Sequence, residues 1–179
     1  MKSYTLNKIR LKGVGLIEIL VAMLVLGIGV MGYAGLQLAA IKNADDAHNL
    51  VRATIIGQDA IERINTNTGQ RAAYFTPSNW PQTAIVPRQV PADWQRCITN
   101  ACSAAQMRDW DIAQLRWIAA NQLIDGRIQG RTCAAGLDCV VVSWGGFPAP
   151  ECVEQDGSIN TSRYVDDVEP KCVVIEVAR

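Results

Sequence analysis

The chain contains a single histidine, His48, and equal numbers of basic and acidic residues, 17 of each. A single histidine makes cysteine–histidine catalysis and a histidine-based metal site improbable from the composition. A balanced charge also provides no general electrostatic surface for nucleic acid. Neither a G-x-S-x-G nucleophile motif nor a G-x-x-x-x-G-K phosphate loop occurs. The sequence therefore predicts that the protein is not an enzyme and needs no cofactor or metal.

One long hydrophobic run stands near the N-terminus. Residues 14–41 carry a single charge, Glu18, and about 20 apolar residues suffice to span a bilayer as a helix. Four cations and no acid precede the run: Lys2, Lys8, Arg10 and Lys12. The positive-inside rule places this leader in the cytoplasm and the rest of the chain outside. Ordinary signal cleavage near Ala39 is an alternative, but the apolar core is longer than such signals have.

Glu18 is costly in this setting. A carboxylate well inside a bilayer costs about 2.5–3.5 kcal/mol on insertion scales. A segment that served only as an anchor would not need it, so the carboxylate predicts a positively charged partner. The simpler alternative is a plain membrane anchor with a stray acidic residue.

The segment Gly13-Val14-Gly15-Leu16-Ile17-Glu18 resembles the class III signal of type IV prepilins. Val14 and Gly15 depart from the residues most common at their positions. The resemblance implies that a prepilin peptidase cuts after Gly13 and that Val14 is then N-methylated. It also implies that Glu18 pairs with the amine of Val14, in its own chain or in a neighbouring subunit, and so sets the register of assembly. The stretch 28–37 further resembles minor pilins of the PilV class.

Six cysteines follow the apolar run, on the side predicted to be exported, where an even number indicates disulfides. The short spacings favour the pairs Cys97–Cys102 and Cys133–Cys139, which leaves Cys152–Cys172, among 15 possible pairings. A metal site is the alternative, but the cysteines lack the C-x2-C spacing that such sites favour.

The helical pattern continues beyond the membrane segment, and the domain that follows is expected to be α+β. One apolar stripe is formed by Ala47, Leu50, Thr54, Gly57, Ile61 and Ile64, and polar residues 65–69 end the helix. We therefore expect a helix over about 14–65, packed on a small antiparallel sheet with an extra helix near 107–123. Strands are predicted at 137–144 and 171–178, and an extended, proline-rich connection at 76–94. The predicted organisation is a leader at 1–13, a membrane helix at 14–41, and the amphipathic half-helix with a periplasmic domain at 42–179.

Several single residues carry weaker expectations. Trp110 and Trp144 are predicted to lie in the core, whereas Trp80 and Trp94 are candidates for exposure. Asp109 and Asp111 are predicted to be solvated charges rather than an acid–base pair. The acidic residues Asp166, Asp167 and Glu169 indicate a solvated turn more strongly than a cation site.

The resemblance implies a structural minor pilin of a type IV pilus, made in the inner membrane with its N-terminus cytoplasmic and its domain periplasmic. It would be assembled at or near the pilus tip and support pilus initiation, twitching motility and adhesion. Its implied partners are the major pilin, other minor pilins, the prepilin peptidase, the inner-membrane assembly machinery and a tip adhesin. One alternative is a minor pseudopilin of a type II secretion system. The other is a tip receptor for DNA or a surface ligand, and DNA is disfavoured because removing the four leader cations leaves 13 basic against 17 acidic residues.

Overall fold

The computed structural model describes residues 15–91, 94, 96–154, 156–160, 165 and 170–178, without the side chain of Ala135. The chain divides into two compact units, 1–45 and 46–179. Helix α1, Leu16–Thr66, contributes its first part to the first unit and its second part to the second. The predicted start at Val14 lies outside the described residues, and the end at Thr66 lies one residue beyond the predicted end.

The second unit contains three further α-helices and several single turns. The helices are α2, Arg71–Tyr74, α3, Arg96–Thr99, and α4, Ala104–Gln122. Helix α4 begins three residues before the predicted Met107 because Ser103 caps it. The Ser103 hydroxyl accepts from the Gln106 amide, and the Gln106 side chain accepts from the Ser103 amide. The 3-10 turns are Thr68–Gln70, Pro77–Asn79, Ala134–Gly136 and Ala149–Cys152.

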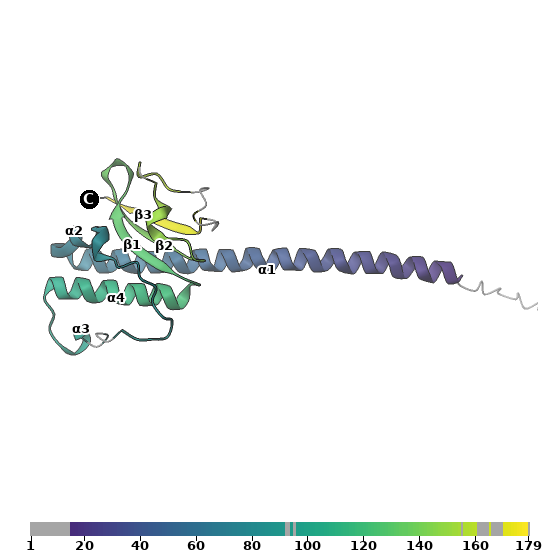
Figure 1. Ribbon diagram of the computed structural model, residues 1–179, viewed down its shortest axis with the longest axis horizontal. Coiled ribbons are helices and arrows are strands. Elements are labelled where there is room, and N and C mark those ends of the chain that lie inside the picture. Colours follow the sequence, from purple (N-terminus) through teal and green to yellow (C-terminus); the bar gives the residue numbers. More distant parts are fainter. Residues whose placement is uncertain are drawn as a thin grey trace, which may run out of the picture. The chain divides into compact units, whose positions relative to one another are not determined.

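A three-stranded antiparallel sheet forms the other half of the second unit (Figure 1). Its order is β1, Arg127–Thr132, then β2, Asp138–Ser143, then β3, Cys172–Val177. The pairs Gly130–Val140 and Val140–Ile175 fix the register of the three strands. The sequence predicted β2 and β3 and missed β1. The expected α+β fold, a long helix on a small antiparallel sheet, is confirmed.

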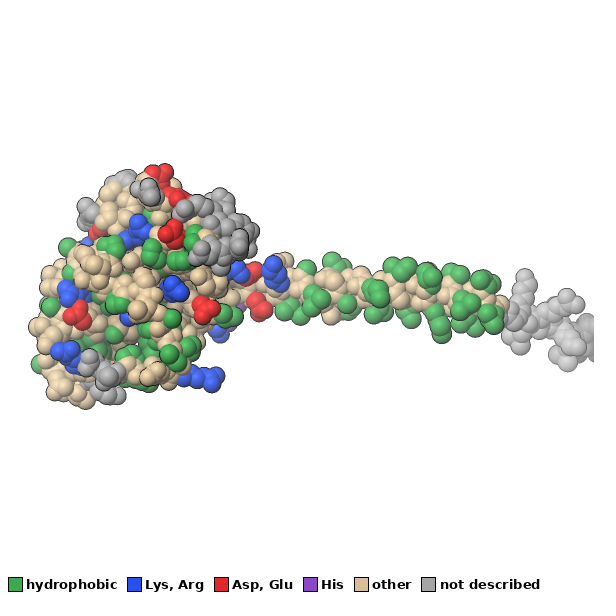
Figure 2. All heavy atoms as spheres, viewed as in Figure 1, with side chains coloured by type: hydrophobic (Ala, Val, Ile, Leu, Met, Phe, Trp, Pro, Cys, Tyr) green, Lys and Arg blue, Asp and Glu red, His purple; other side chains and the backbone are tan. Residues whose placement is uncertain are grey.

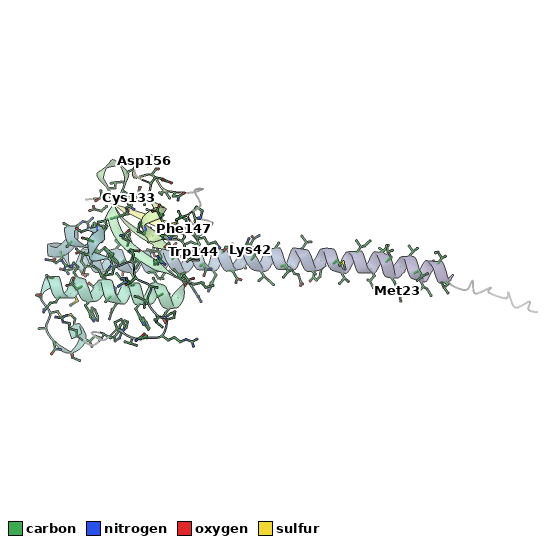
Figure 3. The ribbon with its side chains drawn as sticks, viewed as in Figure 1. Met23, Lys42, Cys133, Trp144, Phe147 and Asp156 are labelled. Carbon is green, nitrogen blue, oxygen red and sulfur yellow. A yellow bond between two sulfur atoms is a disulfide. The ribbon has the colours of Figure 1, made fainter. Side chains whose placement is uncertain are left out.

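Two apolar clusters cover the two faces of β2, in which every residue is buried. On one face, Val140 and Val142 join a cluster with residues of α1 and α4. On the other face, Cys139 and Val141 join a second cluster with Phe147. Figure 3 shows Phe147 and Cys133 of this second cluster beside the sheet. Neighbouring residues of β2 thus pack into different apolar clusters, because successive side chains of a strand point to opposite faces of the sheet.

The stripe by which α1 enters the first cluster differs from the predicted one. It consists of Ala53, Ile56, Gly57, Ala60 and Ile64. Ile61 is only partly buried, whereas Ala47 and Leu50 are exposed. The small residues at 53, 57 and 60 allow the helix to approach the sheet closely. A Cβ atom at Gly57 would lie 2.6 Å from the Ile175 Cδ1 atom.

Candidate functional site

The first part of α1 carries an unusual set of exposed apolar side chains. From Leu16 to Ile41 every described residue is exposed, and the large apolar side chains are between 48% exposed, at Ile19, and 80% exposed, at Met31. Figure 2 shows hydrophobic side chains along the visible face of this segment, and Figure 3 marks Met23 within it and Lys42 just beyond it. Length and composition suffice for this helix to cross a membrane. A surface of this kind is stable in lipid or against other helices, but not in water.

Four glycines interrupt the apolar segment, at positions 27, 29, 32 and 35. A Cβ atom added at any of them would meet no other atom within 4 Å. Contacts among the described residues therefore do not require glycine here. Small residues allow membrane helices to approach one another closely, so these positions are suited to a contact with another helix.

Glu18 lies in the first turn of α1, where its amide donates to the Gly15 carbonyl at 2.9 Å. A carboxylate in the first turn is favoured by the helix dipole. Among the described residues, no basic side chain pairs with Glu18. The predicted cleavage and methylation sites, Gly13 and Val14, lie outside the described residues. The proposed pairing of Glu18 with the Val14 amine therefore stays a prediction.

A polar cluster joins α1 to α4 and α2 inside the second unit. Arg63 donates to Asp59 at 2.9 Å, to Asp111 at 3.2 Å and to Gln114 at 2.8 Å. The Tyr74 hydroxyl donates to the other Asp111 oxygen at 2.6 Å. Asp111 is only 5% exposed, so its prediction as a solvated charge is wrong. Its neighbour Asp109 is exposed and pairs with Arg108, as expected of a surface charge.

The electrostatics of this cluster favour the ion pair and a neutral tyrosine. Burial acts to lower the pKa of Arg63, but hydrogen bonds and charges from Asp59 and Asp111 outweigh it and raise that pKa. Burial, together with the hydrogen bond to Asp111, raises the pKa of Tyr74 well above its ordinary value. A tyrosine held neutral and an arginine held charged are structural rather than catalytic features here, because the cluster is packed between helices.

Two tryptophan side chains differ in burial from the prediction. Trp80 was expected to be exposed but is 1% exposed, with its indole N–H donating to the Tyr74 carbonyl at 2.5 Å. Trp110 was expected in the core but is only half-buried, and its N–H donates to the Trp94 carbonyl at 2.9 Å. Trp94 also packs against Trp117, with ring centroids 4.8 Å apart. Trp144 lies in the core as predicted.

Three disulfides are present: the two closely spaced pairs, Cys97–Cys102 and Cys133–Cys139, and the remaining pair, Cys152–Cys172. The last joins the turn before Val153 to the start of β3. No cluster of three or more metal-ligating side chains exists in the part of the chain that the structure describes. The acidic residues 166, 167 and 169 lie outside it.

Comparison with known families adds one finding. Residues 35–113 match the family model described as Tt1218-like, type IV pilin Tt1218. The matched range is less than half of the chain; it begins in the apolar part of α1 and ends within α4. No curated protein and no solved structure matches the chain. The match supports a type IV pilin, and the proteins of this family are structural rather than enzymatic. The apolar part of α1 fits a membrane-anchored pilus protein.

Proposed function

We propose that this protein is a structural minor pilin of a type IV pilus, of the PilV class, that enters the fibre through the apolar part of α1. The observation that carries the proposal is the helix itself. Its apolar side chains from Leu16 to Ile41 are exposed, and Glu18 stands in its first turn. The family match over residues 35–113 supports the coarser part of the proposal, a structural type IV pilin.

The helix would serve two environments in turn. Before assembly it would span the inner membrane, with the leader in the cytoplasm and the domain in the periplasm. After assembly the same apolar surface would be buried against other pilins, and the domain would be displayed on the fibre near its tip. Lipid tails and the apolar side chains of other pilins are similarly apolar environments. Moving the apolar residues of α1 from the membrane into the fibre therefore costs little free energy. Burial of the Glu18 carboxylate is costly in either environment, and a pair with the amine exposed by cleavage after Gly13 would offset that cost.

Deletion of the gene, followed by two separate assays, tests this function. We expect loss or strong reduction of surface pili and of twitching motility, with normal secretion through the type II system. Complementation should restore the pili, and the protein should be detected in sheared, purified fibres. Normal piliation with lost protein secretion would instead identify a pseudopilin.

Processing is tested on the same material. The mass of the N-terminal peptide from purified fibres should correspond to a chain that begins with N-methylated Val14. Retention of Met1 in assembled fibres would contradict the proposed cleavage.

A further inference from the structure

A small cavity lies in the second unit between the proline-rich connection and α4. Its walls come from residues 81–85 and Pro87, from Arg116 and Ala120 of α4, and from residues 125–128 at the start of β1. Its volume is about 50 Å³. Pockets for whole drug-sized ligands measure about 300–1,000 Å³, whereas one water occupies about 30 Å³. The cavity is therefore suited to one compact chemical group.

Arg116 brings an uncompensated charge to this cavity. Its guanidinium is half-buried, and its Nη2 atom donates to Thr83, at 2.8 Å to the carbonyl and at 3.2 Å to the hydroxyl. Its Nε and Nη1 atoms have no hydrogen-bond partner, and no carboxylate pairs with it, among the described residues. Burial alone lowers the pKa of Arg116, which agrees with the lack of a neighbouring anion. A guanidinium that is partly removed from water and has donors to spare favours an oxyanion as a partner.

Two other side chains of the cavity are also incompletely satisfied. The side chain of Arg127, the first residue of β1, is half-buried and makes neither a hydrogen bond nor an ion pair with any described residue. The Gln82 amide donates to the Trp80 carbonyl at 2.9 Å, but its Oε1 atom is buried without a donor. The single acid of the wall, Asp125, is exposed and does not perturb Arg116. The cavity thus offers two cationic donors and one acceptor.

We propose that this cavity binds a phosphate-class oxyanion, a phosphate or phosphomonoester group, between Arg116 and Arg127. The phosphate oxygens accept from the two guanidinium groups, which match oxyanions in geometry. A singly protonated phosphate also carries a hydroxyl group, which can donate to Gln82 Oε1. A carboxylate lacks that donor, so it satisfies the arginines and leaves Gln82 unpaired. The site would bind a ligand group on the domain and is independent of the role proposed for α1.

Titration of the detergent-solubilised full chain with inorganic phosphate, at constant ionic strength, tests this site. The side-chain Nε–H signal of Arg116 is followed by NMR in protein labelled with 15N-arginine. We expect a saturable shift in the millimolar range, and a response to sodium acetate that is at least about fivefold weaker. A shift that grows linearly without saturation, or an equal response to acetate, would overturn the proposal.

Variants separate this site from general charge effects. Arg127→Met should weaken phosphate binding about tenfold, whereas Arg96→Met, which removes the same charge from an exposed position on α3, should leave it unchanged. Equal weakening by both variants would overturn the proposal. Arg116→Met should abolish binding. If that variant fails to fold, the result for Arg127→Met decides.

Discussion

Asp111 is buried because two different elements supply its partners. Arg63 reaches it from α1, and Tyr74 reaches it from α2. A buried carboxylate is tolerable only when its oxygens accept hydrogen bonds and its charge is compensated. Both conditions hold here, so the residue ties three helices together at one point.

Replacement of Asp111 by Asn should destabilise the second unit by about 1–3 kcal/mol. The change preserves the shape of the side chain but leaves Arg63 with only Asp59 as a charged partner. Urea unfolding of the full chain in detergent, followed by tryptophan fluorescence, measures the effect. Asp109→Asn is the matched control, and it should change stability by less than about 0.5 kcal/mol because Asp109 is exposed. Equal effects of the two changes would contradict the structure.

The raised pKa of Tyr74 leads us to expect a loss of folding stability at alkaline pH. Its pKa is raised above the ordinary 10.0 by burial and by Asp111, so the folded state holds the proton after the unfolded state has released it. Below pH 10 both states are protonated, and the contribution is constant. Above pH 10 stability should fall, by up to about 1.4 kcal/mol per pH unit from this group. The Tyr74→Phe variant should be less stable at neutral pH and should lack this part of the decline. A decline of equal steepness in both proteins would argue against the assignment.

The contrast between Asp109 and Asp111 shows what a sequence can reveal at this scale. Both acids lie on a helix that the sequence predicts, and they flank the same tryptophan. Which of the two acids is buried depends on the rotation of α4 about its axis. The residues that hydrogen-bond to the buried acid, Arg63 and Tyr74, are remote from it in sequence. The sequence prediction placed Trp110 on the buried face of α4, and this assignment of the buried face was wrong. In the structure Ile112, Leu115 and Ala119 mark that face.

At the scale of elements, β1 depends on a glycine. Gly130 lies beneath the segment that runs from Tyr74 to Trp80, and a Cβ atom there would collide with the Tyr74 carbonyl. The Trp80 indole, which donates to that carbonyl, also lies against it. The glycine thus allows the chain after α2 to pack closely on the face of β1.

Gly130→Ala should therefore destabilise the second unit by about 1–3 kcal/mol, because a backbone atom must move to make room. Gly69→Ala serves as the control, since a Cβ atom at Gly69 meets nothing within 4 Å, and it should be neutral within about 0.5 kcal/mol. Thermal unfolding monitored by circular dichroism compares the two variants. An unchanged melting temperature for Gly130→Ala would show that the segment does not pack on β1 in this way.

The three disulfides should differ in their access to reductants. Cys97, on α3, and Cys102 are half-buried and have exposed neighbours, whereas Cys139 and Cys152 are fully buried. Thiol–disulfide exchange requires an attacking thiolate to reach a sulfur atom. Mild reduction of the native protein, followed by alkylation and peptide mass spectrometry, should therefore label Cys97 and Cys102 first. Simultaneous labelling of all six cysteines would contradict this order.

The elements that the sequence predicted and those it missed differ in their local signals. β2 and β3 are rich in valine and isoleucine, so composition identifies them. β1, with the sequence Arg-Ile-Gln-Gly-Arg-Thr, contains one large apolar residue, and its strand conformation comes from pairing with β2. The alternation of Ile128 and Gly130 with polar residues was the available signal. The predicted stripe on α1 was misplaced because the first fully buried residue of the helix is Ala53, and because Ile56 and Ala60 are buried in place of Thr54 and Ile61.

At the scale of the whole molecule, the chain combines a helix segment that water does not favour with a domain that has its own cores. The first 26 residues of α1, Leu16 to Ile41, bury no side chain, whereas both faces of β2 are covered in the second unit. The sequence could predict this division, because the apolar run and the cysteines are separated along the chain. It could not predict the cavity beside Arg116, which depends on how the proline-rich connection lies on α4.

Glu18 is proposed to direct this chain into a pilus. Sheared, purified pili are probed by immunoblot in strains that produce the wild-type chain, Glu18→Ala or Glu62→Ala, with the membrane fraction as a reference. Glu62 is an exposed acid of the second half of α1 and makes no side-chain hydrogen bond or ion pair with any described residue. We expect that all three chains accumulate in the membrane and that only Glu18→Ala is missing from the fibres. Normal incorporation of Glu18→Ala, or absence of the wild-type chain from fibres, would contradict it.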